Sequence, residues 1–176
     1  MILQDSLETE RLRVRPFTDS DVAPLVELFS DPEVARFTGD GEPLSIEDSA
    51  LWVCNSVANL ERFGYGAGAV VEKGGGALVG WAGFARPDGA PDEVIYGFAQ
   101  SAWGRGYATE LLKGLVAFAS GRGLSQVRAT VDRRNFVSVR VLTRQGFTLA
   151  ESDYGEQGVD LYVLAIATTA FDVSGG

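Results

Sequence analysis

The segment Gln100-Ser101-Ala102-Trp103-Gly104-Arg105-Gly106-Tyr107-Ala108-Thr109-Glu110 places two glycines between a strand-like run and a helix-like run. Residues 94–99 before it are β-rich, and from 107 to 119 apolar residues recur with helical spacing. A glycine turn therefore opens a helix. Backbone N–H groups at a helix start are unpaired and lie at the positive end of the helix dipole, so they bind anions. The segment predicts a phosphate or pyrophosphate site.

Two common nucleotide-binding motifs do not fit this segment. The dinucleotide fingerprint needs a third glycine where Thr109 stands, and a P-loop needs a Gly-Lys pair, which the sequence lacks. A structural alternative remains open at this point. Gly104 and Gly106 could form only a tight turn, because turns favour glycine for its positive φ.

Length and composition indicate one globular domain over residues 1–176. Apolar residues make up 45% and charged residues 22% of the chain, and no apolar run approaches the roughly 20 residues of a membrane helix. The first residues lack the basic and apolar regions of a signal peptide. We therefore expect a cytoplasmic protein with no linker and no membrane partner.

The sequence contains no histidine and a single cysteine, Cys54. These counts exclude Ser-His-Asp and Cys-His triads and the usual zinc ligands, so we expect no metal. Proton transfer must use a carboxylate, a tyrosine, water or the substrate. Cys54 is expected to pack on a helix rather than to act as a nucleophile.

Charge is unevenly distributed along the chain, whose net charge is −9. Residues 105–144 hold eight basic and two acidic residues, a net +6, whereas the remainder holds seven basic and 22 acidic residues, a net −15. A polyanionic cofactor and an amine acceptor would account for both signs, although solvated charge is the simpler alternative. A nucleic acid would meet a mostly repulsive surface and is not expected as a partner.

Hydrophobic periodicity and turn residues predict an alternation of strands and helices. Thr18 with Asp21 and Ser45 with Asp48 resemble capping boxes, and Gly64 is expected to end the second helix. Strands are predicted over 11–15, 65–72, 77–86, 94–99, 126–132, 147–154 and 159–168, and helices over 18–29, 45–62, 107–122 and 137–145. This order predicts an α/β or α+β domain with a mixed sheet and helices on both faces.

The glycine segment and three others resemble the GNAT superfamily of N-acetyltransferases, in its ribosomal-protein N-terminal acetyltransferase-like (RimJ/RimL-type) branch. The segments are Thr9–Arg15, Glu93–Phe98, Trp103–Glu110 and Asn135–Phe147, and the resemblance runs from about residue 7 to residue 166. One position departs from the superfamily pattern. Trp103 stands where Gln or Arg is common, a replacement frequent in this branch.

The resemblance implies a GNAT fold with a mostly antiparallel seven-stranded sheet, in which strands four and five splay apart around the pantetheine arm of acetyl-CoA. It implies that this cosubstrate is bound by Phe98, Ala99, Trp103, Gly104, Arg105, Gly106, Tyr107, Ala108, Thr109, Asn135 and Ser138. Arginines between 128 and 144 are predicted to bind the 3′-phosphate of the cosubstrate. Gly97 within strand four marks a bulge or a close approach, or makes room for an aromatic side chain.

The resemblance also implies roles in catalysis. A backbone N–H near Phe98 or Ala99 would polarise the thioester carbonyl, Glu93 would accept the amine proton, and Ser138 would lie near the sulfur. Tyr96, Tyr107 and Tyr154 are further candidate proton donors. Simpler interpretations stay open, because Glu93 could be an exposed loop charge and Asn135 could act only as a helix cap.

Together these observations predict transfer of an acetyl group from acetyl-CoA to a primary amine. The acceptor could be a protein N-terminus, a cationic peptide or a small molecule, and the protein could be a monomer or a homodimer. A different class of function also fits the glycine segment and Asn135. In this alternative the chain is a catalytically idle acyl-CoA-binding module.

Overall fold

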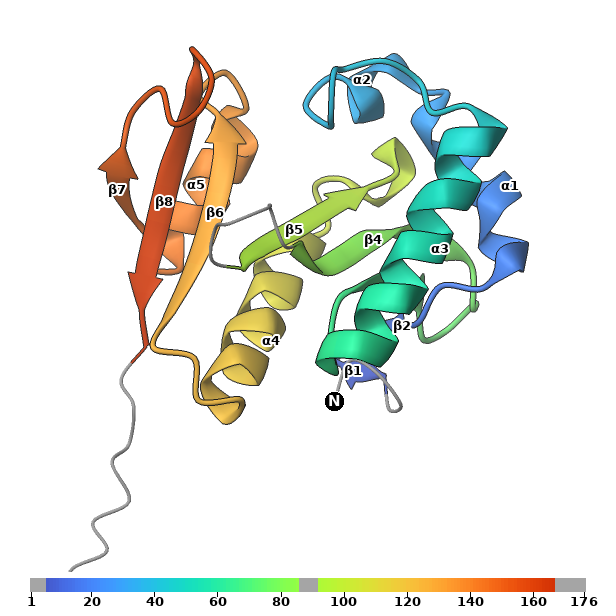
Figure 1. Cartoon of the computed structure of the whole chain (residues 1–176), viewed down its shortest axis with the longest axis horizontal. Helices are drawn as coiled ribbons and strands as arrows, with labels where there is room; N and C mark the ends of the chain where they lie inside the picture. The colour runs from blue at the N-terminus through green and yellow to red at the C-terminus, as the bar shows by residue number, and fades with distance from the viewer. Residues whose placement is uncertain (1–5, 86–91, 167–176) are drawn as a thin grey trace, which may run out of the picture.

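The computed structural model describes residues 6–85 and 92–166, which form one sheet with helices on both of its faces (Figure 1). The elements are β1 (Leu7–Glu8), β2 (Leu12–Arg15), η1 (Asp19–Asp21), α1 (Val22–Phe29), α2 (Pro32–Ala35), α3 (Ile46–Phe63), β3 (Ala67–Glu72), β4 (Leu78–Ala85), β5 (Glu93–Phe98), η2 (Gln100–Ala102), α4 (Tyr107–Gly121), β6 (Gln126–Asp132), α5 (Phe136–Arg144), β7 (Thr148–Glu151) and β8 (Val159–Ala165). Within these residues, no helix has both the length and the apolar character needed to cross a membrane.

The sheet has eight strands in the order β1-β2-β3-β4-β5-β6-β8-β7. Every neighbouring pair is antiparallel except β5 and β6, which are parallel. The predicted number of seven was therefore one too low. The additional strand, β1, has only two residues and pairs with β2, so it is too short to show an alternating pattern in the sequence.

The predicted splay between the fourth and fifth expected strands is confirmed for β5 and β6. These strands have six and seven residues, yet only one register pair joins them, Glu93 with Arg128 at the start of β5. Figure 1 shows the two strands diverging from that point. The rest of β5 is thus paired with β4 alone and leaves its other edge facing β6.

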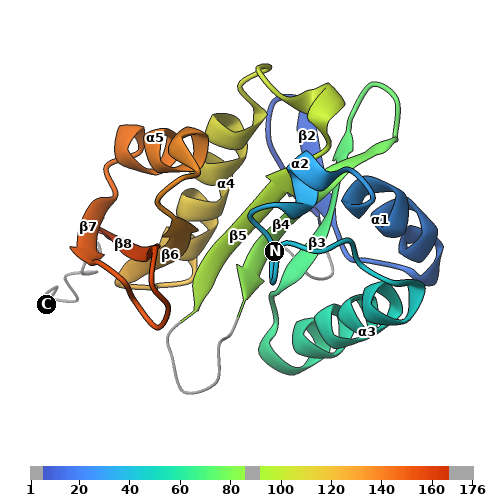
Figure 2. The ribbon, with the colours of Figure 1, turned by 90° about the horizontal axis from the view of Figure 1, so that it is seen from above.

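Apolar cores lie on both faces of the sheet. On one face α4 and α5 cover β5, β6 and β8, around Leu111, Leu115 and Leu142. On the other face α1, α2 and α3 cover β3 and β4, around Phe29 and Trp81. Figure 2 shows the two helix groups on opposite sides of the strands.

Helix ends follow the predicted capping residues closely. The Ser45 hydroxyl accepts from the Asp48 amide at 3.0 Å, and Gly64 ends α3 with φ +83°. Gly146, with φ +89°, follows the last turn of α5, and Phe147 after it is buried. Thr18 does form a capping box with Asp21, but it opens the short helix η1 before α1 rather than α1 itself.

Some expectations differ from the structure. Cys54 lies on the helix α3, but it is exposed, so the packing role expected for it was wrong. The expected strand 147–154 is shorter, because the register shifts between Leu149 and Glu151 and Asp153 has φ +55°. The short helices α2 and η2 were not predicted. Positions 86 and 167–168 of two expected strands lie outside the described residues.

Candidate active site

The glycine segment forms an exposed loop between η2 and α4. Gly104 has φ +72° and Gly106, the N-cap of α4, has φ +79°. No atom lies within 4 Å of where a Cβ of Gly104 would be, so glycine is needed here for its backbone conformation rather than for lack of space. The loop therefore presents open main chain in front of a helix start, as a phosphate site requires.

Side chains of the same segment brace this loop. The Trp103 indole Nε1 donates to the Phe98 carbonyl at 2.8 Å, although the ring is 46% exposed. Arg105 forms an ion pair with Glu72 at 2.7 Å, and the buried Tyr107 hydroxyl donates to the same carboxylate. The Arg105 side chain is therefore already engaged by Glu72 and is not available only for binding a cofactor. The hydrogen bond to Glu72 also raises the pKa of Tyr107.

The free edge of β5 determines which amides face the gap. The Ala99 N–H donates to the Val79 carbonyl of the neighbouring strand at 2.8 Å, so it is not free to polarise a thioester. Hydrogen bonds alternate along an antiparallel strand, which turns the main-chain groups of Phe98 and Tyr96 toward β6 instead. Of the two predicted amides, only Phe98 can serve, and the Tyr96 amide shares its orientation.

A hydroxyl pair bridges β5 and α5 across the gap. Tyr96 Oη lies 2.9 Å from Ser138 Oγ, and the Ser138 amide donates to the Asn135 side chain at 3.1 Å. Burial raises the pKa of Tyr96, while its hydrogen bond to Ser138 opposes this. A phenol kept neutral is a proton donor over the physiological range. Asn135 acts as the N-cap of α5, as its residue type and position predicted.

Glu93 is only 6% exposed and lies where β5 and β6 meet, so it is not a loop charge. The Thr130 hydroxyl donates to its carboxylate at 2.9 Å, and Arg128 lies 3.6 Å from it. Arg128 also donates to the Tyr154 hydroxyl at 2.8 Å. Glu93, Thr130, Arg128 and Tyr154 thus form one contact cluster, the Glu93 cluster. Among the described residues, the Tyr154 hydroxyl makes no direct hydrogen bond to Tyr96 or Ser138.

The Glu93 cluster and the Tyr96–Ser138 pair lie on opposite faces of the sheet. Tyr96 packs against the core under α4 and α5, whereas Gly97 faces Trp81, whose ring would lie 2.1 Å from an added Cβ. Gly97 thus makes room for an aromatic ring, and no bulge occurs there. Glu93 is three residues from Tyr96, which corresponds to about 10 Å along a strand. A proton released near Tyr96 could therefore reach Glu93 only through a bridging water, or if the amine substrate is long enough to extend to Glu93.

Basic residues between 128 and 144 fall into two groups. Arg133 pairs with Asp153 and Asp160, and Arg134 pairs with Asp132, whose pKa it lowers to about 2. Together with the buried Arg128, these side chains already have partners. Within the described part of the chain, the two remaining arginines of this range, Arg140 and Arg144, are exposed and have no carboxylate partner.

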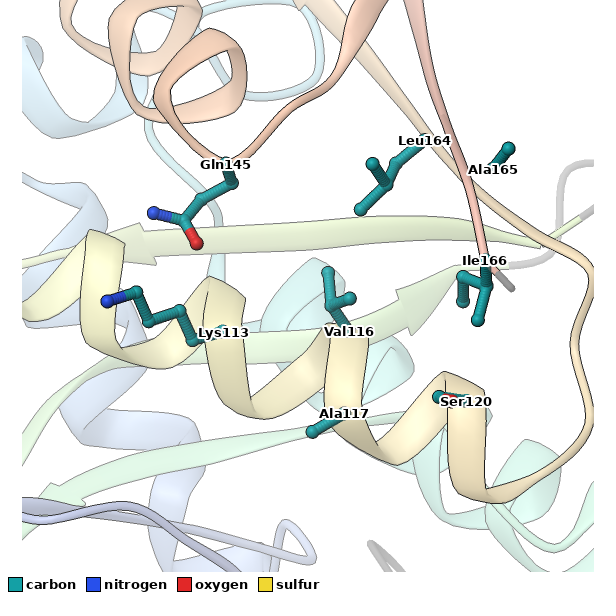
Figure 3. A pocket seen from close by; sticks show the side chains of 8 residues that line it. All are labelled: Lys113, Val116, Ala117, Ser120, Gln145, Leu164, Ala165 and Ile166. Carbon is teal, nitrogen blue, oxygen red and sulfur yellow. The ribbon is translucent and has the colours of Figure 1, made fainter. Parts of the chain in front are cut away.

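Two shallow grooves lie on the surface of the described part of the chain. One, of about 420 Å³, lies between α4 and β8, and Figure 3 shows Lys113 and Gln145 at one end of it and Leu164 and Ile166 at the other. The second, of about 410 Å³, runs between α1, α2 and residues 99–101. Glu27 and Asp31 line the second groove, and its described lining contains no basic residue.

Acidic side chains also flank the open end of the strand pair. Figure 1 shows α2 and the β7–β8 turn at the same end of the molecule, on either side of the diverging strands. The exposed acids of α2, of the loop after it and of residues 151–156 are Glu33, Asp40, Glu42, Glu151, Asp153 and Glu156, of which Glu33 pairs with Arg36 and Asp153 with Arg133. The surroundings of this opening are therefore predominantly negative.

Sequence reasoning missed part of this arrangement. Thr130 was not assigned to the site, and Arg128 was predicted only within the range of arginines for the 3′-phosphate, although both lie in the predicted strand that pairs beside Glu93. Tyr96 was only a further candidate proton donor. The alternation of 126–132 could have indicated which of its side chains share a face, but not which strand lies opposite. That pairing depends on the parallel crossover through α4.

Known proteins resemble this chain in sequence and in structure. Residues 11–148 match the family model described as acetyltransferase (GNAT) domain. An uncharacterized N-acetyltransferase, YoaA of Bacillus subtilis strain 168, is 32% identical over 146 residues, covering 80% of this chain and 81% of that protein.

Solved structures agree with this match. An acetyltransferase from Agrobacterium tumefaciens strain C58 superposes with a TM-score of 0.79 at 26% identity, covering 92% of this chain and 94% of the other. The ribosomal L7/L12 alpha-N-protein acetyltransferase RimL, solved with coenzyme A, has a TM-score of 0.78 at 19% identity, covering 92% and 98%. At this identity RimL supports the fold only.

Proposed function

This chain belongs to the GNAT acetyltransferase family, and we propose that it transfers an acetyl group from acetyl-CoA to a primary amine by direct attack in a ternary complex. One observation carries the proposal. The unpaired edge of β5 leads from the Tyr96–Ser138 hydroxyl pair to the exposed glycine loop. A pantetheine arm bound along that edge would connect a pyrophosphate on the loop to a thioester beside the hydroxyls.

Binding would begin at the glycine loop. The amides at the start of α4, from Gly106 to Thr109, would hold the pyrophosphate, while the Phe98 amide would bond to the cosubstrate in the gap. The unpartnered Arg140 and Arg144 are the candidates for the 3′-phosphate. This assignment narrows the predicted range of arginines, because Arg128, Arg133 and Arg134 have other partners.

The chemical step needs a neutral amine, a polarised carbonyl and a proton for the departing thiolate. The amine nitrogen attacks the thioester carbon, a C–N bond forms and the C–S bond breaks. The Phe98 or Tyr96 amide would stabilise the developing oxyanion, and Tyr96, bonded to Ser138, would protonate the thiolate. Glu93 would accept the amine proton through water, given its distance along β5.

The acceptor is proposed to be cationic. The groove next to residues 99–101 carries Glu27 and Asp31, and exposed acids flank the opening between α2 and the β7–β8 turn. A positively charged peptide or polyamine would be attracted to this side and steered to it at low ionic strength. The relative RimL is described as acting on a protein N-terminus, and the same acceptor class is proposed here.

One observation favours the catalytically idle alternative. The Glu93 carboxylate is buried and already engaged by Thr130 and Arg128, so its bonds are compatible with a purely structural role. In that case the chain would bind acyl-CoA without turnover. The roles proposed for the other cosubstrate-binding residues would be the same.

A thiol-release assay with acetyl-CoA across a panel of amines and peptides separates the two functions. We expect CoA thiol to appear only when an amine is present, with cationic acceptors preferred. Binding of CoA, seen as a rise in Tm, without amine-dependent thiol release from any acceptor class would favour the idle module. Absence of both would contradict the cosubstrate assignment.

A further inference from the structure

The N-terminal segment Thr9-Glu10-Arg11 has no part in the chemistry above, yet its side chains reach the glycine loop. Arg11 precedes β2, and its guanidinium Nη1 donates to the Arg105 carbonyl at 2.9 Å. Its Nη2 lies 3.6 Å from where a Cβ of Gly106 would be, and the group stacks on the Tyr107 ring, 4.6 Å from the ring centre. Arg11 therefore lies directly against the loop.

The same arginine holds the first turn of α4. Arg11 Nε donates to Glu110 at 2.7 Å, and the Arg11 amide donates to the other oxygen of that carboxylate at 2.8 Å. The Thr9 hydroxyl also donates to Glu110. These hydrogen bonds lower the pKa of Glu110 in spite of the opposing effect of its burial.

One planar fork thus ties together two points on either side of the glycine. The Arg105 carbonyl comes immediately before Gly106, and Glu110 comes four residues after it. The Glu110 amide closes the turn by donating to the Gly106 carbonyl at 3.1 Å. A guanidinium can bind a carbonyl and a carboxylate at once in fixed geometry, which an ammonium cannot.

Charge gives the contact a second consequence. Glu110 lies in the first turn of α4, where a carboxylate stabilises the helix but repels an anionic ligand at the same end. Arg11 pairs with that carboxylate beside the loop. The pairing leaves the helix start attractive to phosphate.

We propose that Arg11 is a positioning residue for the glycine loop, which holds the left-handed turn at Gly106 and thereby the amides that bind pyrophosphate. The effect on cosubstrate binding rests on the proposed function, whereas the effect on the loop does not. Arg11 would act through the Arg105 carbonyl and Glu110 rather than through the ligand.

Amide hydrogen exchange of the ligand-free protein tests the proposal. In Arg11→Met, exchange at the Glu110 amide should become roughly tenfold faster than in the unaltered chain, as expected when hydrogen bonds to a charged group are lost. The matched control is Arg13→Met, two residues along the chain, since Arg13 pairs only with the exposed Glu8 at 2.9 Å. Equal exchange in the two variants would overturn the proposal.

Kinetics supply the second measurement. The KM for acetyl-CoA should rise about tenfold in Arg11→Met with kcat changed by less than about twofold, and Arg13→Met should match the unaltered chain. A higher KM with unchanged exchange would mean that Arg11 binds the ligand directly, which also overturns positioning. If the unaltered chain binds no CoA, the proposed function fails while the exchange result still decides the loop contact.

Should Arg11→Met fail to fold by circular dichroism, Arg11→Lys provides the same test. Lysine keeps the cation but lacks the fork, so it cannot bond to the Arg105 carbonyl and Glu110 in the same geometry. Faster exchange at Glu110 in Arg11→Lys supports the proposal. Exchange equal to that of Arg13→Met overturns it.

Discussion

The two sides of the splayed strand pair differ in chemistry and in how they are built. On the side of α4 and α5 lie glycines, hydroxyls and unpaired cations, contributed by residues 96–110 and 135–144. On the other side lie the buried Glu93 with Arg128 and Thr130, and exposed acids from residues 33–42 and 151–156. A polyanion suits the first side and an amine the second, so one gap can bring both to a common point.

The largest expected effect comes from blocking the first side. Gly106→Glu places a carboxylate and a side chain at φ +79° where pyrophosphate would bind, so CoA should no longer raise the Tm at millimolar concentration. Gly123→Glu is the matched control, because Gly123 has φ +74° and open surroundings at the far end of α4. A folded Gly106→Glu protein with a normal Tm shift would contradict the phosphate assignment.

The next effect concerns the second side. Glu93→Gln retains the shape and can still accept from Thr130, but it removes the base, so kcat should fall about 10²-fold while the affinity for acetyl-CoA barely changes. The loss should shrink as the pH rises, since more of the amine is already neutral. Glu61→Gln, on the exposed side of α3, serves as the control. Normal turnover at neutral pH would leave Glu93 a structural residue.

A smaller effect distinguishes the proton donor from the base. Tyr96→Phe should lower kcat about tenfold rather than more, because the Ser138 hydroxyl remains beside the thiolate position. Burial raises the pKa of Tyr96 above the ordinary tyrosine value, so the phenol stays protonated below that value. The ratio of rates should therefore be the same at pH 7 and pH 9, unlike that of Glu93→Gln.

The buried Tyr162→Phe is the control for this variant, since no hydrogen bond of its hydroxyl is seen among the described residues. Unchanged kcat in Tyr96→Phe would transfer the donor role to Ser138 or to water. A ratio that grows between pH 7 and pH 9 would show that the phenol ionises in this range, against the direction expected from its burial.

The first side could be predicted from the sequence because its parts are local. The glycine turn, the Asn135 cap and the spacing to Ser138 each lie within a few residues, and the resemblance to a family placed them in order. The second side was mostly missed. Arg128 and Thr130 meet Glu93 only because the chain crosses over through α4 to form a parallel pair with a single register point.

Other errors have the same origin. Cys54 was expected to pack on a helix, but it is exposed because the buried face of α3 is formed by Ser49, Val53, Ser56 and Leu60 instead. The strand β1 and the helix α2 are stabilised by tertiary contacts and are too short for a pattern. By contrast, Gly64 and Ser45 were correct helix limits, since capping depends on neighbouring main chain alone.

The smallest expected effect tests whether the cosubstrate site on the first side includes Arg140 and Arg144. Arg140→Ala combined with Arg144→Ala should raise the KM for acetyl-CoA only about threefold to fivefold, because both side chains are exposed and their attraction to a phosphate is screened by solvent and salt. Dephospho-acetyl-CoA should bind more weakly than acetyl-CoA to the unaltered chain and equally well to this variant. Arg134→Ala is the control, since Arg134 already pairs with Asp132. If both cosubstrates bind the unaltered chain equally at low salt, the positively charged segment 105–144 does not bind the 3′-phosphate and serves another partner. The first side would then differ from the second only in the glycine loop and the hydroxyl pair.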